Sequence, residues 1–308
     1  MESLWSGRND GDTPEHRRWH QHVTPLTTGA SPGIALIGYA VDEGVRRNHG
    51  RTGAATGPSA IRRALAPLAL HLTSPIHDAG DITLTGQDLE GAQRALGESV
   101  AALLDQQHLV IALGGGHDIA WGTYLGRRSS NRLRAAQTAV INLDAHFDLR
   151  RAGQPTSGTP FLQMADAEAI AGRRFDYSVL GISRTANTRA LFESAAQLGV
   201  NYLLDVQCAP RHLDRVAESV SEILSRNDAI HLSIDLDVLP AATAPGVSAP
   251  AAYGVALETV EAICHQVASS GRLALVDVAE LNPNFDIDGR TARVAARLID
   301  TICRASES

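Results

Sequence analysis

The residues best suited to chemistry in this sequence are acids and imidazoles that stand two positions apart. Asp144, His146 and Asp148 occur together in DAHFD. On an extended backbone, side chains at this spacing point to the same side. Three ionisable groups on one side of a strand end are costly to bury without a partner, and a divalent cation offsets that cost. DAHFD is therefore a candidate metal-binding segment.

Two other segments carry related patterns. Asp235 and Asp237 stand side by side in DLD after an apolar run, and two such like charges again call for a cation. His117 follows three glycines in GGGHD, which let the backbone turn tightly and approach a site closely. The complete set of candidate metal ligands is His117, Asp144, His146, Asp148, Asp235 and Asp237.

These four carboxylates and two imidazoles could hold two cations. We expect one cation at His117 and Asp148, the other at His146 and Asp237, and the remaining two carboxylates in bridging positions. The oxygen-rich donor set suits manganese better than zinc. Two ions about 3.5–4 Å apart can share a water and lower its pKa towards about 7, which presents hydroxide at neutral pH.

Each segment also has an ordinary interpretation when it is taken alone. DxHxD and DxD occur as turn devices at strand exits, and GGGH occurs as a tight turn with a satisfied histidine. The combination of all three, each after an apolar run of strand length, favours the metal centre.

The elements that must position these segments alternate along the chain. Short runs rich in Val, Ile and Leu have the length of buried strands and occupy 33–40, 108–114, 138–144, 176–182, 200–205, 229–237 and 272–278. Amphipathic stretches of helical length lie between them, for example at 58–69, 89–107, 186–199, 213–227, 255–271 and 289–305. This alternation predicts an α/β fold with a mainly parallel sheet and helices on both faces. Ligands of such sheets bind outside the carboxyl ends of the strands, where the candidate residues lie.

The bulk properties exclude several classes of protein. The 308 residues suffice for one large α/β domain, and we expect a polar N-terminal extension over 1–30 and a single domain over 31–308. The net charge of -7 argues against a nucleic-acid partner. There is neither an 18-residue apolar run nor a signal-peptide pattern, and the three widely spaced cysteines form no CxxC pair. We therefore expect a cytoplasmic protein without a membrane partner.

GGGHD, DAHFD and SIDLDVLPAATAPGVSAP together resemble the metal-binding signatures of the ureohydrolase family, which includes arginases, agmatinases and formimidoylglutamases. The resemblance runs from GYAVDEG near the start to AELNPNFDIDGRTARVAARL near the end. It implies a three-layer α/β/α, arginase-like fold, two Mn²⁺ ions per subunit, a homo-oligomer, and hydrolysis of linear C–N bonds in guanidine or amidine groups. It assigns the ligand role to the same six residues. It also assigns to Glu280, in ELNP, the role of holding the cationic head of the substrate.

The tail of the substrate distinguishes the branches of the family. Arginases and agmatinases usually carry a His-Gly pair in the stretch that reads TSGTPFLQ here, with Ser157 at the position of that histidine. SGTPF, GGGHDIAWG, DAHFDLR and RTARVAARL are most similar to the formimidoylglutamase branch. Its substrate carries two carboxylates, which guanidinium groups bind bidentately. The candidate substrate-binding residues are Arg150, Arg184, Ser157, Thr159 and Asn187, although either arginine could instead be a surface or ion-pair residue.

The resemblance therefore predicts hydrolysis of N-formimidoyl-L-glutamate to L-glutamate and formamide by hydroxide on the metal pair, a step of histidine degradation. Glu280 would hold the amidinium, and Asp148 would pass a proton to the leaving amine. In the loop 46–59, Asn48, His49 and Arg51 could reach the substrate or brace the loop. The alternatives are another ureohydrolase, such as a guanidinobutyrase or agmatinase, and a non-catalytic metal-binding regulatory protein. A deacetylase of the same broad fold is disfavoured because the sequence has no His-His pair.

Overall fold

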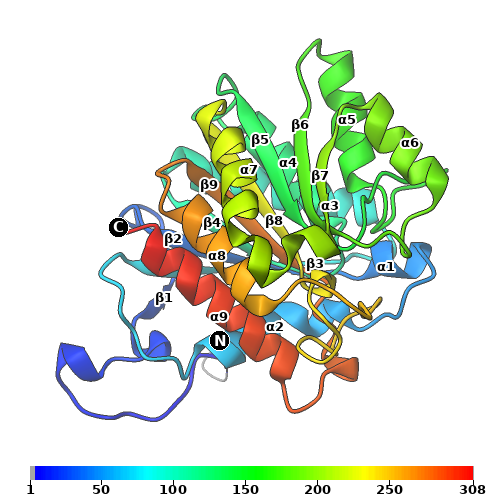
Figure 1. Cartoon of the computed structure of the whole chain (residues 1–308). Coiled ribbons are helices and arrows are strands. Elements are labelled where there is room, and N and C mark those ends of the chain that lie inside the picture. The colour runs from blue at the N-terminus through cyan, green and yellow to red at the C-terminus, as the bar shows by residue number, and fades with distance from the viewer. Residues whose placement is uncertain (1–3, 308) are drawn as a thin grey trace.

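The computed structural model describes residues 4–307, and one parallel sheet runs through its centre. Within this range nine strands pair in the order β1-β3-β2-β4-β9-β8-β5-β6-β7 (Figure 1). Their bounds are β1 Val23–Pro25, β2 Ile34–Ala40, β3 Ile76–Thr83, β4 Leu109–Leu113, β5 Thr138–Leu143, β6 Asp176–Ile182, β7 Asn201–Leu204, β8 Ala229–Asp235 and β9 Leu273–Ala279. Every pairing is parallel, which confirms the predicted type of sheet.

Helices cover both faces of the sheet and complete the predicted three layers (Figure 1). One layer consists of α2 Gly57–Leu65, α9 Arg290–Ala305, α8 Leu257–Ala268 and α7 Leu213–Ser225. The other contains α3 Leu89–Asp105, α4 Ile119–Ser129, α5 Pro160–Ile170 and α6 Arg189–Gln197, and the short α1 Glu43–Arg47 follows β2. Successive residues of a strand point to opposite layers: Ile141 packs towards α7 and α8, whereas Val140 packs towards α4 and α5. Burial on both faces explains why the central strands are mainly apolar.

The apolar runs predict neither β1 nor β3, because β1 is a three-residue edge strand and β3 is polar. Asp78 lies in β3 and is buried, and it accepts two hydrogen bonds from Arg62 of α2, at 2.9 and 2.8 Å. A buried charge is tolerated when it is paired, so this strand can be buried without an apolar sequence pattern.

The predictions also omit α4, which contains Gly122 and Gly126. A Cβ on Gly126 would lie 2.6 Å from a Val100 side-chain atom of α3, so this glycine permits the two helices to pack closely.

The N-terminal segment lies against the domain through two tryptophans. Trp19 is fully buried, and its indole N–H donates to Asp300 of α9 at 3.0 Å. The indole of Trp5 donates to Asp78 at 2.7 Å. The division of the chain at residue 30 stays a prediction. Elsewhere, no helix of the described chain is long and apolar enough to cross a bilayer.

Trp19→Ala is expected to lower the free energy of unfolding by about 3–5 kcal/mol, because the change empties a fully buried site and removes one hydrogen-bond donor to Asp300. Denaturant titration measures the effect. Trp5→Ala is the comparison, since Trp5 is only partly buried. If Trp19→Ala lowers the free energy of unfolding no more than Trp5→Ala does, the N-terminal segment does not contribute to the core.

Candidate active site

The candidate site residues follow four strands that are neighbours in the sheet, β4, β9, β8 and β5. The GGGHD segment follows β4, DAHFD follows β5, and DLD begins at the last residue of β8. Glu280 follows directly on β9. All four strands are parallel, so their carboxyl ends lie at one edge of the sheet, and the structure brings the distant segments together there.

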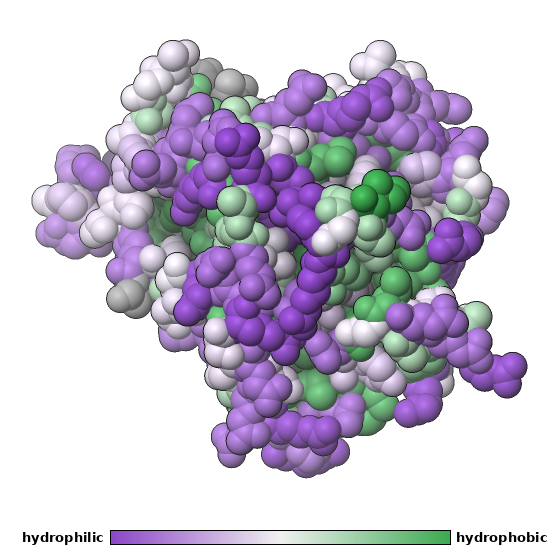
Figure 2. Space-filling view, turned by 90° about the horizontal axis from the view of Figure 1, so that it is seen from above, coloured by the Kyte–Doolittle hydropathy of each residue, from purple (hydrophilic) through white to green (hydrophobic). Residues whose placement is uncertain are grey.

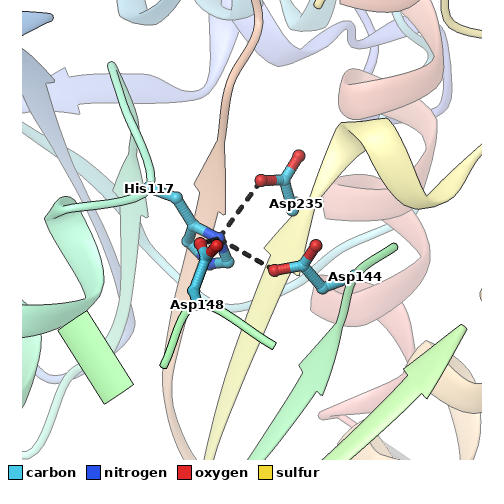
Figure 3. A group of neighbouring side chains, drawn as sticks. All are labelled: His117, Asp144, Asp148 and Asp235. Atoms are coloured by element: carbon cyan, nitrogen blue, oxygen red, sulfur yellow. Dashed lines mark ion pairs between the residues drawn. The ribbon is translucent and has the colours of Figure 1, made fainter. Parts of the chain in front are cut away.

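Four of the predicted ligands form a first group around one nitrogen (Figure 3). Nδ1 of His117 lies 3.1 Å from a carboxylate oxygen of each of Asp144, Asp148 and Asp235. This nitrogen is buried and has no hydrogen bond of acceptable geometry within the described residues. Adjacent ligands of an octahedral ion with bonds of about 2.1 Å lie about 3 Å apart. The spacing therefore fits donor atoms around a cation better than it fits a hydrogen-bonded histidine.

A second group contains Asp144, His146 and Asp237. Nδ1 of His146 lies 3.1 Å from Asp237 Oδ2 and 3.4 Å from Asp144 Oδ1. Asp144 thus offers one oxygen to each group, as expected of a bridging carboxylate. Asp235 differs from the expectation, because it belongs to the first group alone: its Oδ2 faces His117, and neither of its oxygens joins the second group.

The backbone and neighbouring side chains hold the groups in place. Asn142 donates to Asp144 Oδ2 at 3.0 Å, and Asn142 stands two positions earlier on the same side of β5. Asp148, Glu280 and His49 have φ angles of +47°, +69° and +60°, a left-handed conformation that costs energy for residues with a side chain. Asn142 is not among the residues predicted for the site, although its spacing from Asp144 is a signal that identifies it.

Burial and crowding shift the ionisation of these groups. Burial, together with the neighbouring carboxylates, raises the pKa of Asp148 and the pKa of Asp235. Burial opposes charge on His117, but the surrounding carboxylates raise the pKa of its imidazole well above the ordinary value. The pKa of His146 is raised in the same way, against the effect of burial, by Asp237 and Asp144. Without cations the cluster therefore retains protons that a bound metal must displace.

Metal affinity is accordingly expected to fall as the pH falls. The raised pKa values of His117 and His146 mean that both imidazoles hold their protons more tightly in the metal-free protein than a free histidine does. Each proton released on binding weakens the affinity by up to about tenfold per pH unit of acidification. Isothermal titration with Mn²⁺ between pH 8.5 and pH 6, in buffers of different ionisation enthalpy, measures both the affinity and the released protons. Binding that is independent of pH and releases no proton would contradict the assignment.

The cluster opens into a cavity of about 290 Å³. Its lining comprises Asn48, His49, Gly50, Arg51, His117, His146, Asp148, Arg150, Ser157, Asp235, Asp237, Ser248, Ala249 and Glu280. One wall is polar and cationic: Arg150 donates to Asn48 Oδ1 at 3.1 Å, and Asn48 donates to Ser157 Oγ at 3.1 Å. Arg51 also lines the cavity, and its side chain donates to the Ser248 carbonyl at 3.0 Å. The guanidinium carbon of Arg51 stands 3.9 Å from the centre of the Phe285 ring.

Glu280 supplies a buried carboxylate to the same cavity. Its Oε1 accepts a hydrogen bond from the backbone N–H of His117 at 2.9 Å, which ties it to the first metal group. Burial raises the pKa of this carboxyl to about 8. A planar cation that enters the cavity would offer Glu280 both charge and hydrogen bonds, and would thereby stabilise its ionised form.

Three of the candidate substrate-binding residues lie outside the cavity lining. Arg184 is exposed and stands over the Phe192 ring at 5.8 Å. Thr159 accepts from the Thr156 backbone N–H and lies 2.9 Å from Gln163 Oε1. The Asn187 side chain accepts from the backbone N–H of Phe147 and donates to the Ala145 and Ser183 carbonyls, so that it braces the DAHFD segment. Only Arg150 and Ser157 of the five candidates line the cavity.

The sequence of this chain was compared with protein families and with curated proteins, and both comparisons point to one family. The model of the arginase family matches residues 32–304, nearly the whole chain. The chain belongs to the arginase family. This arginase-family chain is 54% identical over 300 residues to the formimidoylglutamase of Rhodococcus opacus strain B4, covering 97% of this chain and 94% of that protein. It is 49% identical over 302 residues to the formimidoylglutamase of Chromobacterium violaceum, covering 98% and 97%.

Solved structures show the same arginase-family fold. The formimidoylglutamase from Bacillus subtilis superposes with a TM-score of 0.86 at 23% identity, covering 99% of this chain and 97% of that one. A formiminoglutamase from Trypanosoma cruzi, solved with Mn²⁺, gives a TM-score of 0.79 at 25% identity, covering 89% and 93%. The arginase family has a binuclear metal site, and the two groups that share Asp144 are the His and Asp side chains here that could hold its ions.

Proposed function

We propose that this protein hydrolyses N-formimidoyl-L-glutamate to L-glutamate and formamide. The observation that carries the proposal is one cavity in which the buried carboxylate of Glu280 stands beside the metal groups while Arg150 and Arg51 stand in the wall. This combination suits a substrate with a cationic amidine head and an anionic tail. The names of the curated relatives support the same substrate.

We propose Mn²⁺ as the resident cation at both positions, held by His117, Asp144, Asp148 and Asp235 in the first group and by Asp144, His146 and Asp237 in the second. The oxygen-rich ligand set and the Mn²⁺ of the Trypanosoma cruzi relative support this choice. Such a pair of ions supplies a water of lowered pKa, so that hydroxide is available near neutral pH.

The side chains of this chain orient the substrate. Glu280 pairs with the amidinium nitrogen and keeps the amidine carbon next to the metal groups. Arg150 binds a carboxylate of the glutamate tail, and Arg51 stands in the same lining to bind the other. Thr159, Asn187 and Arg184 lie outside this lining, and we propose that the first two contribute by bracing the loops around it.

The reaction adds water across the amidine C–N bond that joins the formimidoyl group to glutamate. A C–O bond forms at the amidine carbon, the C–N bond breaks, and the leaving amine takes a proton. We assign that proton transfer to Asp148, whose carboxyl lines the cavity and whose pKa is raised by burial and by Asp144. The products are formamide and glutamate in its ammonium form, which balances the atoms and charge of the amidinium substrate and water.

The test is to measure formamide and glutamate released from formimidoylglutamate by the Mn²⁺-loaded protein, beside arginine, agmatine and guanidinobutyrate. Formimidoylglutamate is expected to be the best substrate, and removal of metal by a chelator is expected to abolish its turnover. Activity that survives complete metal removal would overturn the mechanism. If guanidinobutyrate or agmatine is turned over faster than formimidoylglutamate, that compound replaces formimidoylglutamate as the proposed substrate. Full metal binding without turnover of any of these compounds would favour a regulatory role.

Arg150→Ala is expected to raise KM about 10–100-fold, because a charge-assisted hydrogen bond contributes about 1.5–3 kcal/mol. Metal content should stay at the wild-type level, since Arg150 touches the tail and not the metal groups. Arg151→Ala is the matched control: its side chain is 77% exposed and it does not line the cavity. An unchanged KM in Arg150→Ala would remove this residue from the site, and a comparable rise in Arg184→Ala would restore Arg184 to it.

We further propose a cytoplasmic homo-oligomer that takes part in histidine degradation and has no nucleic-acid partner. The three cysteines are buried and unpaired, which suits a reducing compartment. Much of the face seen in Figure 2 is hydrophilic, with small apolar patches between, and exposed apolar residues such as Ile170 and Ile287 offer contact points for a second copy. Light scattering coupled to size exclusion measures the oligomer, and a monomer at micromolar concentration would contradict it.

A further inference from the structure

A chain of buried hydrogen bonds leads from the first metal group into the sheet. Nε2 of His117 lies 2.9 Å from Ser233 Oγ, and Ser233 donates to Asp277 Oδ1 at 2.5 Å. All three side chains are essentially inaccessible to solvent. We propose that Asp277 is a positioning residue: acting through Ser233, it fixes the tautomer and ring orientation of His117 and thereby sets the affinity of the first metal position. The inference rests on the proposed metal pair.

The direction of each hydrogen bond follows from the chemistry of the groups. An ionised carboxylate only accepts, so the Ser233 hydroxyl must donate to Asp277. The oxygen of Ser233 is then free to accept from His117 Nε2–H. A neutral imidazole has one ring hydrogen, so Nδ1 presents a lone pair to Asp144, Asp148 and Asp235. A lone pair facing three carboxylates is unfavourable unless a cation lies between them, and the relay therefore prepares His117 as a ligand.

The sheet itself positions the relay. Ser233 of β8 and Asp277 of β9 are direct partners across the two paired strands. Nε2 of His231 lies 2.5 Å from Asp277 Oδ2, and the Thr123 hydroxyl lies 2.9 Å from the same oxygen. Burial opposes ionisation of Asp277, but the adjacent His231 and the hydrogen bond from Ser233 keep its pKa below the usual range. Asp277 is consequently a charged acceptor when it meets Ser233.

The relay serves only one of the two metal groups. His146 is the histidine of the second group, and its side chain is 20% exposed. Within residues 4–307, its Nε2 has no hydrogen bond comparable to that between His117 and Ser233. Breaking the relay should therefore weaken one metal position and spare the other, whereas general damage to the fold would affect both.

The experiment titrates chelator-treated protein with Mn²⁺, without substrate, and measures the affinity of each bound equivalent for wild type, Asp277→Asn and Ser233→Ala. In Asp277→Asn the amide can donate to Ser233, so Ser233 donates to His117 Nε2 and Nδ1 carries the hydrogen that obstructs the cation. We expect one equivalent to lose affinity about 10–100-fold in both variants while the other is unchanged. Asp78→Asn is the matched control: Asp78 is also a buried, hydrogen-bonded carboxylate, but it lies in β3 and pairs with Arg62.

Ser233→Ala removes only a hydroxyl and leaves the pairing of His231 with Asp277 intact, so it tests the relay even if Asp277→Asn does not fold. Two equivalents of wild-type affinity in either folded variant would overturn the proposal, as would an equal loss at both positions. A wild-type protein that binds no Mn²⁺ would overturn it together with the metal assignment. Selective loss of one equivalent, in a protein that does not hydrolyse formimidoylglutamate, would support the relay and refute only the proposed substrate.

Discussion

Asp144→Asn is expected to remove both metal ions and to reduce turnover of formimidoylglutamate to about 10⁻³ of the wild-type rate or less. Asp144 is the residue that offers one oxygen to each metal group, to His117 through Oδ2 and to His146 through Oδ1. Without the ions, the pKa of the attacking water returns to the much higher value of bulk water, so hydroxide is no longer available at neutral pH. Metal analysis after dialysis and a formamide assay measure the two effects.

Asp237→Asn provides the comparison for this variant, because Asp237 belongs to the second group only. It is expected to retain one equivalent of metal, whereas Asp144→Asn retains none. Asparagine has nearly the same size as aspartate, so the fold of Asp144→Asn is expected to be preserved. Circular dichroism of the variant checks this. If Asp144→Asn binds two equivalents at wild-type affinity, the shared carboxylate lies elsewhere, and Asp235, the other carboxylate expected to bridge, becomes the candidate.

Glu280→Gln is expected to lower kcat/KM about 10²–10⁴-fold while metal content stays unchanged. The substrate amidinium would enter a buried cavity and lose its charged partner, and an unpaired buried charge costs about 3–5 kcal/mol. Glutamine preserves the size of the side chain and can still accept the hydrogen bond from the His117 backbone N–H, so the loop that carries His117 is preserved. Steady-state kinetics with formimidoylglutamate and metal analysis measure the two quantities.

Glu168→Gln is a suitable control for Glu280→Gln, because Glu168 is also a buried glutamate but lies in α5 and pairs with Arg173. Its kcat/KM should remain close to wild type. If Glu280→Gln keeps wild-type kcat/KM, another group holds the amidinium. If instead it loses metal along with activity, Glu280 acts on the metal groups through His117 and not on the substrate.

The central part of the fold could be predicted because its strands are buried on both faces. Such strands are mainly apolar, so β2, β4, β5, β6, β8 and β9 appear in the sequence as short runs rich in Val, Ile and Leu with a few polar residues among them. β3 escaped prediction because the pairing of Asp78 with Arg62 replaces apolar burial by a satisfied ion pair. α4 escaped because glycines that allow close packing against α3 weaken the helical pattern.

The candidate metal ligands and the candidate substrate-binding residues differ in how far the structure brings them together, and the difference has a physical cause. A ligand pair such as Asp144 and Asp148 stands within five residues just past the end of one strand, so the two side chains must lie near each other whatever the rest of the chain does. Arg150 and Arg184 lie on separate loops, and only Arg150 reaches the cavity. The direction of a long side chain on a loop depends on neighbours that are distant in sequence, such as Asn48 for Arg150.

By itself, the sequence determined the α/β sheet, the segments at the carboxyl ends of its strands, and the six candidate ligands, because strand periodicity and the cost of buried charge act within a few residues. Only the tertiary structure decided that, of the two carboxylates expected to bridge, Asp144 belongs to both groups and Asp235 to one, and that Arg51 joins the cavity wall. The same holds for the relay from Asp277 through Ser233 to His117. These three features depend on pairing between β8 and β9 and on loops that meet across the sheet, and such contacts join residues far apart in the chain.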